Sequence, residues 1–302
     1  MRLCRFDDNR FGVVDGPVIR DVTAALDELP RAGYPFPSHD ILVEHLDGVV
    51  NRARALMPHA RTVATDSVTL LSPVANPGKI VAAPVNYEKH RVEATKDPQL
   101  HGNSPGSAFN IHTAGLFLKA TSSLVGPGQD VVLRRPDRRT DHEVELVIVI
   151  GKRANRVRRQ DAMAYVAGYT IGLDISIRGS EDRSFRKSPD TYSVLGPWLV
   201  TADEIANPGG LDLQIFVNGE VRQHSNTRHM LLGVAELIEM ASSMYTLHPG
   251  DLIFSGTPEG VSPIHPGDSI VATIAHIGTM AVAVRADQTI SAPAMSTSSA
   301  GV

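Results

Sequence analysis

The sequence predicts an α+β fold that is mostly β, made of one large domain and a small N-terminal α/β domain. Short segments rich in β-branched residues follow one another between residues 79 and 285, with turn residues between them. They do not alternate regularly with helices, so a doubly wound parallel sheet does not fit. A break containing proline and glycine at residues 71–78 indicates a linker after a first domain of residues 1–70. Residues 286–302, rich in serine and alanine, are expected to form a flexible tail.

Side-chain periodicity predicts the individual elements. Strands of the large domain are expected at residues 79–83, 114–118, 131–133, 143–150, 167–171, 211–217, 251–254, 269–274 and 280–285. Two helices are expected there, at 159–165 and 230–243, and the second carries a single apolar stripe. In the small domain, the pattern favours strands at 2–6 and 11–14 and a helix at 41–57.

Bulk composition excludes several classes of protein. A formal net charge of -4 and a pI near 6.3 argue against general binding to nucleic acid or to membrane surfaces. No stretch approaches the roughly 20 apolar residues that span a bilayer. Cys4 is the only cysteine, so no internal disulfide is expected, and the first residues lack the apolar run of a signal peptide. We therefore expect a cytoplasmic protein.

Arginine gathers in two stretches, at residues 134–139 and 152–159. Each stretch borders a predicted strand, so solvated loops are the simpler interpretation. The alternative is that one of these arginines reaches an acidic substrate.

Two glutamates stand at the start of the most apolar predicted strand. The strand 143–150 ends in five apolar residues, so both of its faces should be buried. Side chains alternate along a strand, so Glu143 and Glu145 share one face with their Cα atoms about 6.6 Å apart. Two carboxylates this close repel each other unless a proton, an arginine or a cation compensates. A hard dication with oxygen ligands would do so, whereas two solvated acids at an ordinary strand end remain the alternative.

A third acid follows in the next apolar segment, 165–176, in which Asp174 is the only charged residue. An aspartate that ends such a strand either caps the following helix or binds a ligand. From this segment alone, the helix cap is the simpler interpretation.

Several motifs, taken in order, resemble the fumarylacetoacetate hydrolase family over roughly residues 75–285, in its acylpyruvase or 2-hydroxyhepta-2,4-diene-1,7-dioate isomerase-like branch. Each motif alone is weak, but their order and spacing are specific. They begin at Asn86 (Asn-Tyr-Glu-Lys-His), Leu116 (Leu-Phe-Leu-Lys), Asp141 (Asp-His-Glu-Val-Glu), Gly168 (Gly-Tyr-Thr-Ile-Gly-Leu-Asp), Val194 (Val-Leu-Gly-Pro-Trp), Val217 (Val-Asn-Gly-Glu-Val-Arg-Gln) and Pro249 (Pro-Gly-Asp-Leu-Ile-Phe-Ser-Gly-Thr-Pro-Glu-Gly).

The resemblance implies a β-roll catalytic domain, a homodimer and a bound Mg²⁺ or Mn²⁺ ion. The acid-x-acid pair and the later aspartate that hold the metal in the family fall here on Glu143, Glu145 and Asp174. Spacing alone did not decide whether these three acids bind a cation. The resemblance implies that they form a metal site.

The resemblance also implies a catalytic group. The family's water-activating histidine falls on His90, with Glu93 placed to orient it on a helical turn. Lys187 matches a lysine that faces substrate oxygens. Without the family context, a surface histidine beside a surface glutamate would be the simpler interpretation. The polar segment 94–108, with its glycine and proline residues, is expected to be a lid over the substrate.

The resemblance also implies substrate contacts at Tyr87, Lys119, Arg178, Glu181 and Thr257. Thr257 matches a family position that contacts a substrate carboxylate, whereas a structural role for Lys119 stays open. The chain also departs from the family. Glu181 stands where many members have glutamine, and Pro189 stands where phenylalanine is usual. Both departures bear on substrate recognition.

The small-molecule substrate implied by the resemblance is a 2-oxo acid. A 2-oxo carboxylate chelates a divalent cation through two oxygens, and the cation polarises its carbonyl. We expect a hydrolase that cleaves a C–C bond in a 2,4-diketo acid of the acylpyruvate or fumarylpyruvate type, from aromatic or related catabolism. The alternatives are a decarboxylase or keto-enol isomerase of a 2-oxo or hydroxymuconate-type diacid, and a non-catalytic metal-binding scaffold.

Overall fold

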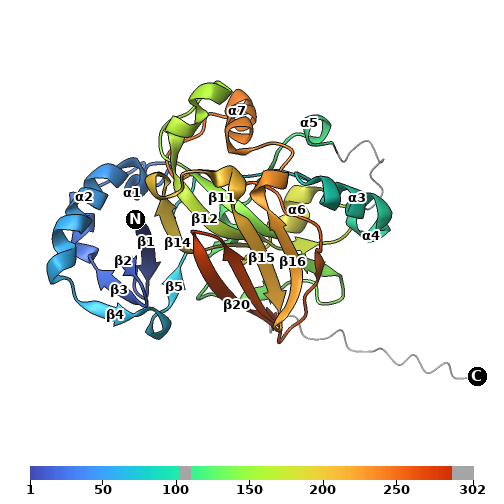
Figure 1. The fold of residues 1–302 in the computed structure, drawn as a ribbon, viewed down its shortest axis with the longest axis horizontal. Coiled ribbons are helices and arrows are strands. Elements are labelled where there is room, and N and C mark those ends of the chain that lie inside the picture. Colours follow the sequence, from blue (N-terminus) through green and yellow to red (C-terminus); the bar gives the residue numbers. More distant parts are fainter. Residues whose placement is uncertain (102–109, 288–302) are drawn as a thin grey trace, which may run out of the picture.

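A long mixed sheet runs from the N-terminal residues into the centre of the molecule. The computed structural model describes residues 1–101 and 110–287 (Figure 1). In spatial order, the sheet contains β4 (Thr62–Ala64), β3 (Val18–Asp21), β2 (Arg10–Asp15), β1 (Arg2–Phe6), β14 (Ser193–Thr201), β12 (Val166–Asp174), β11 (Val144–Ile150), β17 (Leu252–Phe254), β6 (Ile80–Ala82) and β7 (Phe117–Lys119). Two short strands lie off this path: β5 (Leu70–Leu71) pairs with β1, and β8 (Leu124–Val125) pairs with β14.

Two smaller sheets complete the β structure. One has the order β16 (Glu220–Asn226), β15 (Asp212–Val217), β19 (Ser269–Ile274), β20 (Gly278–Ala286) and β9 (Val131–Leu133). The other has the order β13 (Ser176–Ile177), β10 (Thr140–His142) and β18 (Ser262–Pro263). The central strands of these sheets come from distant parts of the chain, so the fold depends on long-range pairing.

Helices are short and lie around the sheets. The α-helices are α1 (Ile41–Glu44), α2 (Leu46–Leu56), α3 (Glu88–Lys96), α4 (Pro98–His101), α5 (Ile111–Ala114), α6 (Arg183–Lys187) and α7 (Val234–Met244). The 3-10 turns are η1 (Thr23–Glu28), η2 (Met57–His59), η3 (Thr65–Ser67), η5 (Thr121–Ser123), η6 (Arg159–Tyr165), η7 (Ala202–Glu204), η8 (Pro208–Gly210) and η9 (Thr227–His229). In Figure 1, α2 lies at one end of the molecule and α3, α4 and α6 at the other. Among the described residues, no helix is long and apolar enough to cross a membrane.

Strand β11 is buried on both faces, as its apolar sequence predicts. Val147 and Val149 pack into a cluster with the N-terminal strands, α2 and β17. Leu146 and Ile148 face the other way, into the main core with β15, β19 and α7. Because side chains alternate along a strand, Glu143 and Glu145 lie on the face of Val147, beyond the end of its apolar cluster. Two apolar cores therefore hold the strand that carries the candidate site.

The fold class predicted from the sequence is confirmed, with local corrections. Residues 159–165 form a 3-10 turn, not an α-helix, and the predicted helix 230–243 begins only at Val234. The predicted helix 41–57 is interrupted at His45. Residues 111–114 are helical, so the strand expected at 114–118 starts at Phe117. Strands β14 and β16 were not predicted.

The predicted division into domains stays a prediction. β1 pairs with β14, so residues 1–70 and the large domain share one sheet, with Arg2 opposite Val200 and Leu3 opposite Leu199. Of the predicted linker 71–78, residue 71 ends β5 and residues 72–78 lie between β5 and β6. Of the predicted tail, residues 288–302 lie outside the described part of the chain.

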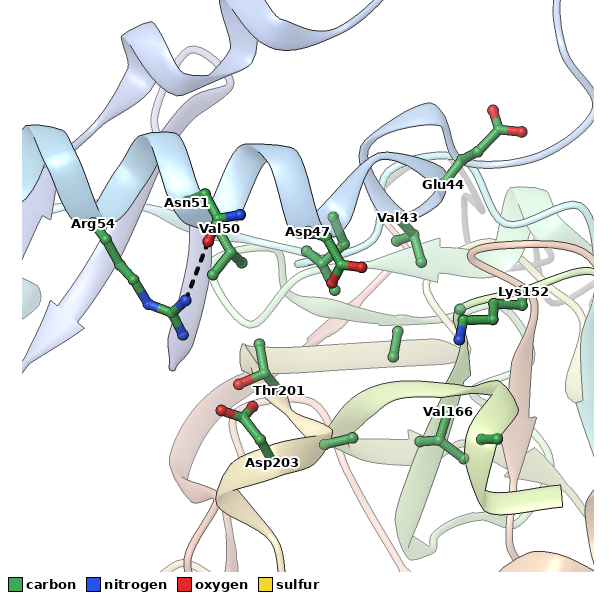
Figure 2. A pocket seen from close by; sticks show the side chains of 15 residues that line it. Val43, Glu44, Asp47, Val50, Asn51, Arg54, Lys152, Val166, Thr201 and Asp203 are labelled. Atoms are coloured by element: carbon green, nitrogen blue, oxygen red, sulfur yellow. Dashed lines mark hydrogen bonds between the residues drawn. The ribbon is translucent and has the colours of Figure 1, made fainter. Parts of the chain in front are cut away.

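A hollow of about 560 Å³ lies where α1 and α2 face the sheet (Figure 2). Its charged side chains are mixed in sign and include Asp47, Arg54 and Asp203. Arg54 donates to the Asn51 side chain at 3.3 Å. None of the site residues predicted from the sequence lines this hollow. It is therefore not the predicted active site.

Candidate active site

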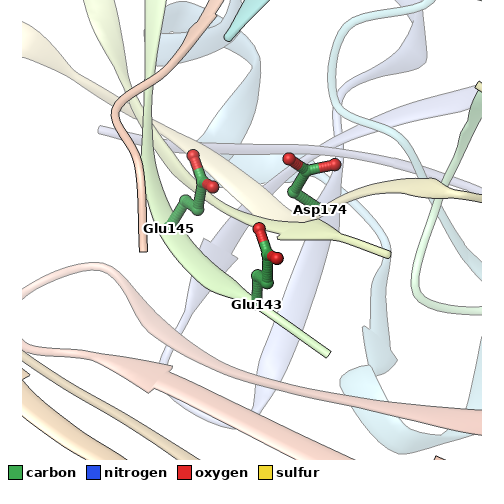
Figure 3. Close-up of side chains that lie close together, drawn as sticks. All are labelled: Glu143, Glu145 and Asp174. Atoms are coloured by element: carbon green, nitrogen blue, oxygen red, sulfur yellow. The ribbon is translucent and has the colours of Figure 1, made fainter. Parts of the chain in front are cut away.

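The antiparallel register of β11 and β12 brings three carboxylates together. Glu145 lies opposite Gly172, and the backbone N–H of Asp174 donates to the carbonyl of Glu143 at 2.9 Å. Asp174 therefore lies on the neighbouring strand, beside the glutamate pair. One carboxylate oxygen from each of Glu143, Glu145 and Asp174 lies within 4.8 Å of the other two, and all three residues are buried (Figure 3).

Two buried lysines partly neutralise these acids. The ammonium of Lys187 lies 2.7 Å from Glu143 Oε2 and 2.6 Å from Asp174 Oδ2. The ammonium of Lys119 lies 2.5 Å from Asp174 Oδ1 and donates to the carbonyl of Tyr192 at 2.8 Å. Asp174 caps no helix here, because Asp182 caps α6 by accepting from the Ser184 amide. The helix-cap interpretation of Asp174 is therefore wrong.

The glutamates differ in how they are compensated. Burial opposes ionisation of Glu143, but Lys187 and Arg178 outweigh it and hold its pKa well below the usual range. Burial raises the pKa of Glu145 well above the usual range, and the neighbouring Asp174 and Glu143 raise it further. Within the described part of the chain, no lysine, arginine or histidine forms an ion pair with Glu145.

Glycine is required where the loop after β17 meets Glu145. The Gly256 amide donates to Glu145 Oε2 at 2.7 Å, with a φ of 89° that L side chains rarely adopt. A Cβ at this position would also lie 2.7 Å from the Cβ of Asn86. The Gly-Thr-Pro motif thus positions one backbone donor against the acid cluster.

His90 and Glu93 form the predicted pair on α3. His90 Nδ1 lies 2.8 Å from Glu93 Oε2, and the Gly260 amide donates to Glu93 Oε1 at 3.0 Å. His90 is 6% exposed, so it is not the surface histidine of the simpler interpretation. Because the carboxylate engages Nδ1, Nε2 remains as the ring nitrogen available to a substrate or water.

One cavity of about 50 Å³ joins the histidine to the acid cluster. It is lined by Ala83, Pro84, Val85, His90, Ala94, Leu100, Phe117, Glu143, Glu145, Arg178, Arg183, Arg186, Lys187 and Thr257. The cavity thus contains both the predicted catalytic histidine and two of the clustered acids. Its apolar residues come from the segment between β6 and α4 and from β7. Of the predicted lid 94–108, residues 102–108 lie outside the described part of the chain.

Three of the predicted substrate contacts lie outside this lining. Tyr87 is buried beside the site, and its hydroxyl has no hydrogen-bond partner within the described residues. Lys119 lies behind Asp174, which fits the structural role left open for it. Glu181 is exposed and forms an ion pair with Arg138 at 2.7 Å. The position of Glu181 does not favour contact with a substrate in the cavity, and its role stays a prediction.

Arg178 and Thr257 do line the cavity. Arg178 donates to Asp141 Oδ2 and to Glu143 Oε1, at 2.7 Å each. The Thr257 hydroxyl donates to the carbonyl of Val144 at 2.9 Å and accepts from Gln223 Nε2 at 2.9 Å. Both residues are held in place by bonds to the segment that carries the glutamates.

The sequence prediction missed several residues that organise the site. Asp141 is fully buried and joins Arg178 to Arg139, whose other nitrogen contacts Asp97 at 2.8 Å. Gln223 accepts from the Val144 amide while donating to the Thr257 hydroxyl. Both Asp141 and Gln223 lie in the quoted motifs, and their position there was the available signal. The arginines around 134–139 are all paired with acids, some of them exposed, as the solvated-loop interpretation expected for most of them.

Residues 79–285 match the family described as Fumarylacetoacetate (FAA) hydrolase C-terminal, which is more than half of the chain. The chain belongs to the fumarylacetoacetate hydrolase family. The resemblance inferred from the motifs is confirmed.

Individual members of this family are similar over most of the chain. Maleylpyruvate hydrolase of Aquipseudomonas alcaligenes is 55% identical over 285 residues, which cover 94% of this chain and 99% of that protein. Human mitochondrial oxaloacetate tautomerase FAHD2A is 37% identical over 240 residues, which cover 75% of this chain and 73% of that protein. The crystal structure of maleylpyruvate hydrolase from Sphingobium sp. SYK-6, in complex with manganese(II) and pyruvate, has a TM-score of 0.80 and 40% identity, over 95% of this chain and 100% of that one.

Proposed function

We propose that this chain is a divalent-metal-dependent hydrolase that cleaves a C–C bond in a 2,4-diketo acid, with maleylpyruvate-type acids as its substrate class. The observation that carries the proposal is the single cavity that presents His90 opposite the buried carboxylates of Glu143 and Glu145. The 55% identity to a maleylpyruvate hydrolase, over nearly all of both chains, supports it.

The donor set fits Mg²⁺ or Mn²⁺. Glu143, Glu145 and Asp174 offer carboxylate oxygens, which these hard cations prefer, and the oxygens are close enough to converge on one ion. The pKa of Glu145 is raised because burial, Asp174 and Glu143 oppose its negative charge more than Lys187 and the Gly256 amide favour it. A divalent ion held there would polarise the carbonyl of a 2-oxo acid. A manganese-bound structure of a relative adds support.

The residues of this chain supply the proton transfer and the charge stabilisation. His90 accepts a proton from water at Nε2 while Glu93 holds the imidazole from the other side. The water oxygen adds to the carbonyl carbon at position 4, and Lys187 is placed to stabilise the developing oxyanion. The C–C bond then breaks, its electron pair leaves with the 2-oxo acid portion, and a proton returns to that portion. The products are one carboxylic acid and one 2-oxo acid, so one water is consumed.

A second candidate function uses the same site without attack by water. The relationship to a human oxaloacetate tautomerase favours keto-enol tautomerisation of a 2-oxo diacid. There, His90 would move a proton between carbon and oxygen, and the substrate would keep all of its carbon atoms. Decarboxylation of such a diacid is a further alternative.

Product analysis separates these activities. Metal-loaded protein is mixed with maleylpyruvate, acetylpyruvate or oxaloacetate, and the products of a single turnover are quantified by NMR in ¹⁸O-labelled water. Hydrolysis gives two acids with one ¹⁸O in the new carboxylate, decarboxylation releases CO₂, and tautomerisation changes only the keto-enol ratio. Protein that accelerates tautomerisation but cleaves neither diketo acid would contradict the hydrolase proposal.

We also infer a homodimer in the cytoplasm, on the family resemblance and on the single buried Cys4. Burial raises the pKa of the Cys4 thiol to about 12, so this cysteine is not a nucleophile. Light scattering during gel filtration tests the dimer: a mass of one chain would contradict it.

A further inference from the structure

Three arginines line the cavity, and two of them are already bonded within the protein. Arg178 contacts Asp141 and Glu143. Arg186 donates from Nε to the carbonyl of Glu181 and from Nη1 to the carbonyl of Ile177, at 2.8 Å each. The guanidinium of Arg183 makes no hydrogen bond or ion pair with any residue that the structure describes. Among the residues that the structure describes, Arg183 is therefore the arginine of this cavity whose guanidinium has no bonded partner.

Arg183 is also poorly placed for solvation. The residue is half-buried, and burial lowers the pKa of its guanidinium against the opposing charges of Asp182 and Glu143. The Asp182 side chain accepts from the Ser184 amide instead of bonding to Arg183. A half-buried guanidinium with no partner has lost hydration without a compensating bond, and an anion supplied by a ligand would restore it.

The spacing of Arg183 and Lys187 on α6 indicates how far apart two anionic groups of a substrate would lie. The two residues are at positions i and i+4 of α6, so their Cβ atoms are about 5–6 Å apart on one face of the helix. Lys187 contacts two of the acids of the metal-binding set, which marks the end of the cavity for the 2-oxo acid. A second anionic group about one helical turn farther along the substrate would reach Arg183. In maleylpyruvate-type acids, the distal carboxylate lies a few bonds beyond the bond that breaks.

Part of the cavity wall is apolar. Val85, Ala94, Leu100 and Phe117 line the cavity together with Ala83 and Pro84. Such a surface accepts the hydrocarbon part of a diacid and offers nothing to a hydroxylated chain. The cavity therefore combines the cationic side chains of α6 with an apolar part of its wall.

We propose that Arg183 determines specificity by binding the distal carboxylate of a 2,4-diketo diacid. This inference rests on the proposed hydrolase function and narrows its substrate class to diacids. The planar guanidinium can form two parallel hydrogen bonds to a carboxylate, a geometry that lysine cannot reproduce.

The test compares a diacid with a monoacid on the same enzyme. Metal-loaded parent, Arg183→Gln and Arg183→Lys are assayed with maleylpyruvate and with acetylpyruvate, which lacks the distal carboxylate. We expect Arg183→Gln to lower kcat/KM for maleylpyruvate by about 10- to 100-fold, the usual effect of losing a charged hydrogen bond. The value for acetylpyruvate should change less than about threefold. Arg183→Lys should lie between parent and Arg183→Gln for the diacid only.

The matched control is Arg135→Gln, which removes an exposed guanidinium paired with Asp137 outside the cavity. It should leave the ratio of the two substrates unchanged. Equal losses for both substrates in Arg183→Gln, or no loss for either, would overturn the proposal. If Arg183→Gln lacks the thermal unfolding transition of the parent, the Arg183→Lys comparison decides.

Failure of the hydrolase proposal is recognised separately, because the parent itself would then cleave neither substrate. In that case, calorimetric binding of the uncleaved diacid and monoacid to parent and Arg183→Gln still tests Arg183. A preference of the parent for the diacid that disappears in the variant supports the assignment, and an unchanged preference overturns it.

Discussion

Asp174 lies directly across the sheet from Glu143, with its backbone nitrogen 2.9 Å from the carbonyl oxygen of Glu143. This bond continues the β11–β12 register, which pairs Val144 with Leu173 and Glu145 with Gly172 and so places the third carboxylate against the pair on β11. A shift of one residue would turn Asp174 to the opposite face of the sheet. The acid cluster is therefore a property of strand pairing, and the apolar cores on both faces of β11 maintain it.

Removing the metal should abolish turnover and lower thermal stability. Parent protein treated exhaustively with a chelator is assayed before and after addition of Mg²⁺ or Mn²⁺, and its Tm is followed by calorimetry. An ion at 100 times its Kd stabilises the folded state by about 2.7 kcal/mol. Asp174→Asn should lose most of this response, whereas Asp161→Asn, an exposed acid paired with Arg158, should keep it. Full activity after chelation would contradict the metal site.

Glu145→Gln should stabilise the metal-free protein at neutral pH. The pKa of Glu145 in the folded protein is raised above the ordinary value of 4.5 by burial and by Asp174 and Glu143. A group with a raised pKa contributes stability below its unfolded pKa, and this contribution is lost as pH rises toward its folded pKa. The metal-free variant should therefore gain in Tm over the parent as pH rises above 4.5, and match it near pH 4.

Saturating metal should reverse that order, because the glutamine carries one ligand charge less. The control Glu220→Gln changes an exposed acid paired with Arg222 and should show neither effect. Equal Tm values for metal-free parent and Glu145→Gln across this pH range would show that the acid cluster is not strained by its own charge.

The closeness of Glu143 and Glu145 could be predicted, because strand periodicity places both on one face. That inference needs only the alternation of side chains along one segment, and the structure agrees with it. Asp174 could not be placed from spacing, because its position depends on the pairing of β11 with β12. The family resemblance indicated Asp174 as the third acid, whereas the local signal favoured a helix cap.

Other parts of the site depend on contacts that the sequence does not encode locally. Strand β14 (Ser193–Thr201) contains Gly196 and Pro197, which usually argue against a central strand, yet it pairs with both β1 and β12. Arg183 was not distinguished from its neighbours, because what sets it apart is that Arg178 and Arg186 are bonded and it is not, among the residues that the structure describes. Periodicity shows which face of a strand or helix a side chain lies on. The strands and side chains that it contacts depend on packing between distant parts of the chain.

Glu181→Gln should leave substrate preference nearly unchanged. The departure from the family pattern at this position suggested an effect on substrate range, but the carboxylate is exposed and paired with Arg138. That pairing lowers the pKa of Glu181 to about 2, so its small stabilising effect is lost only as pH falls from 4.5 toward 2. The ratio of kcat/KM for maleylpyruvate and acetylpyruvate should change less than about threefold, because an exposed ion pair contributes little. A tenfold change would return Glu181 to the substrate-binding residues.

His90→Ala should lower kcat by about 10²–10⁴, the usual contribution of a positioned acid–base group. Metal affinity, measured by calorimetry, should barely move, because His90 is not one of the three clustered carboxylates. Glu93→Gln should cost less, because Glu93 orients the imidazole through Nδ1 and still offers an acceptor to the Gly260 amide after the change. The control His112→Ala removes an exposed histidine on α5 and should leave kcat unchanged.

The double variant of His90→Ala and Glu93→Gln should be no slower than His90→Ala alone, since His90 and Glu93 act on one proton transfer. A His90→Ala protein that binds metal normally and hydrolyses diketo acids at the parental rate would remove His90 from the mechanism, and the proton would then have to be accepted by another group in the cavity.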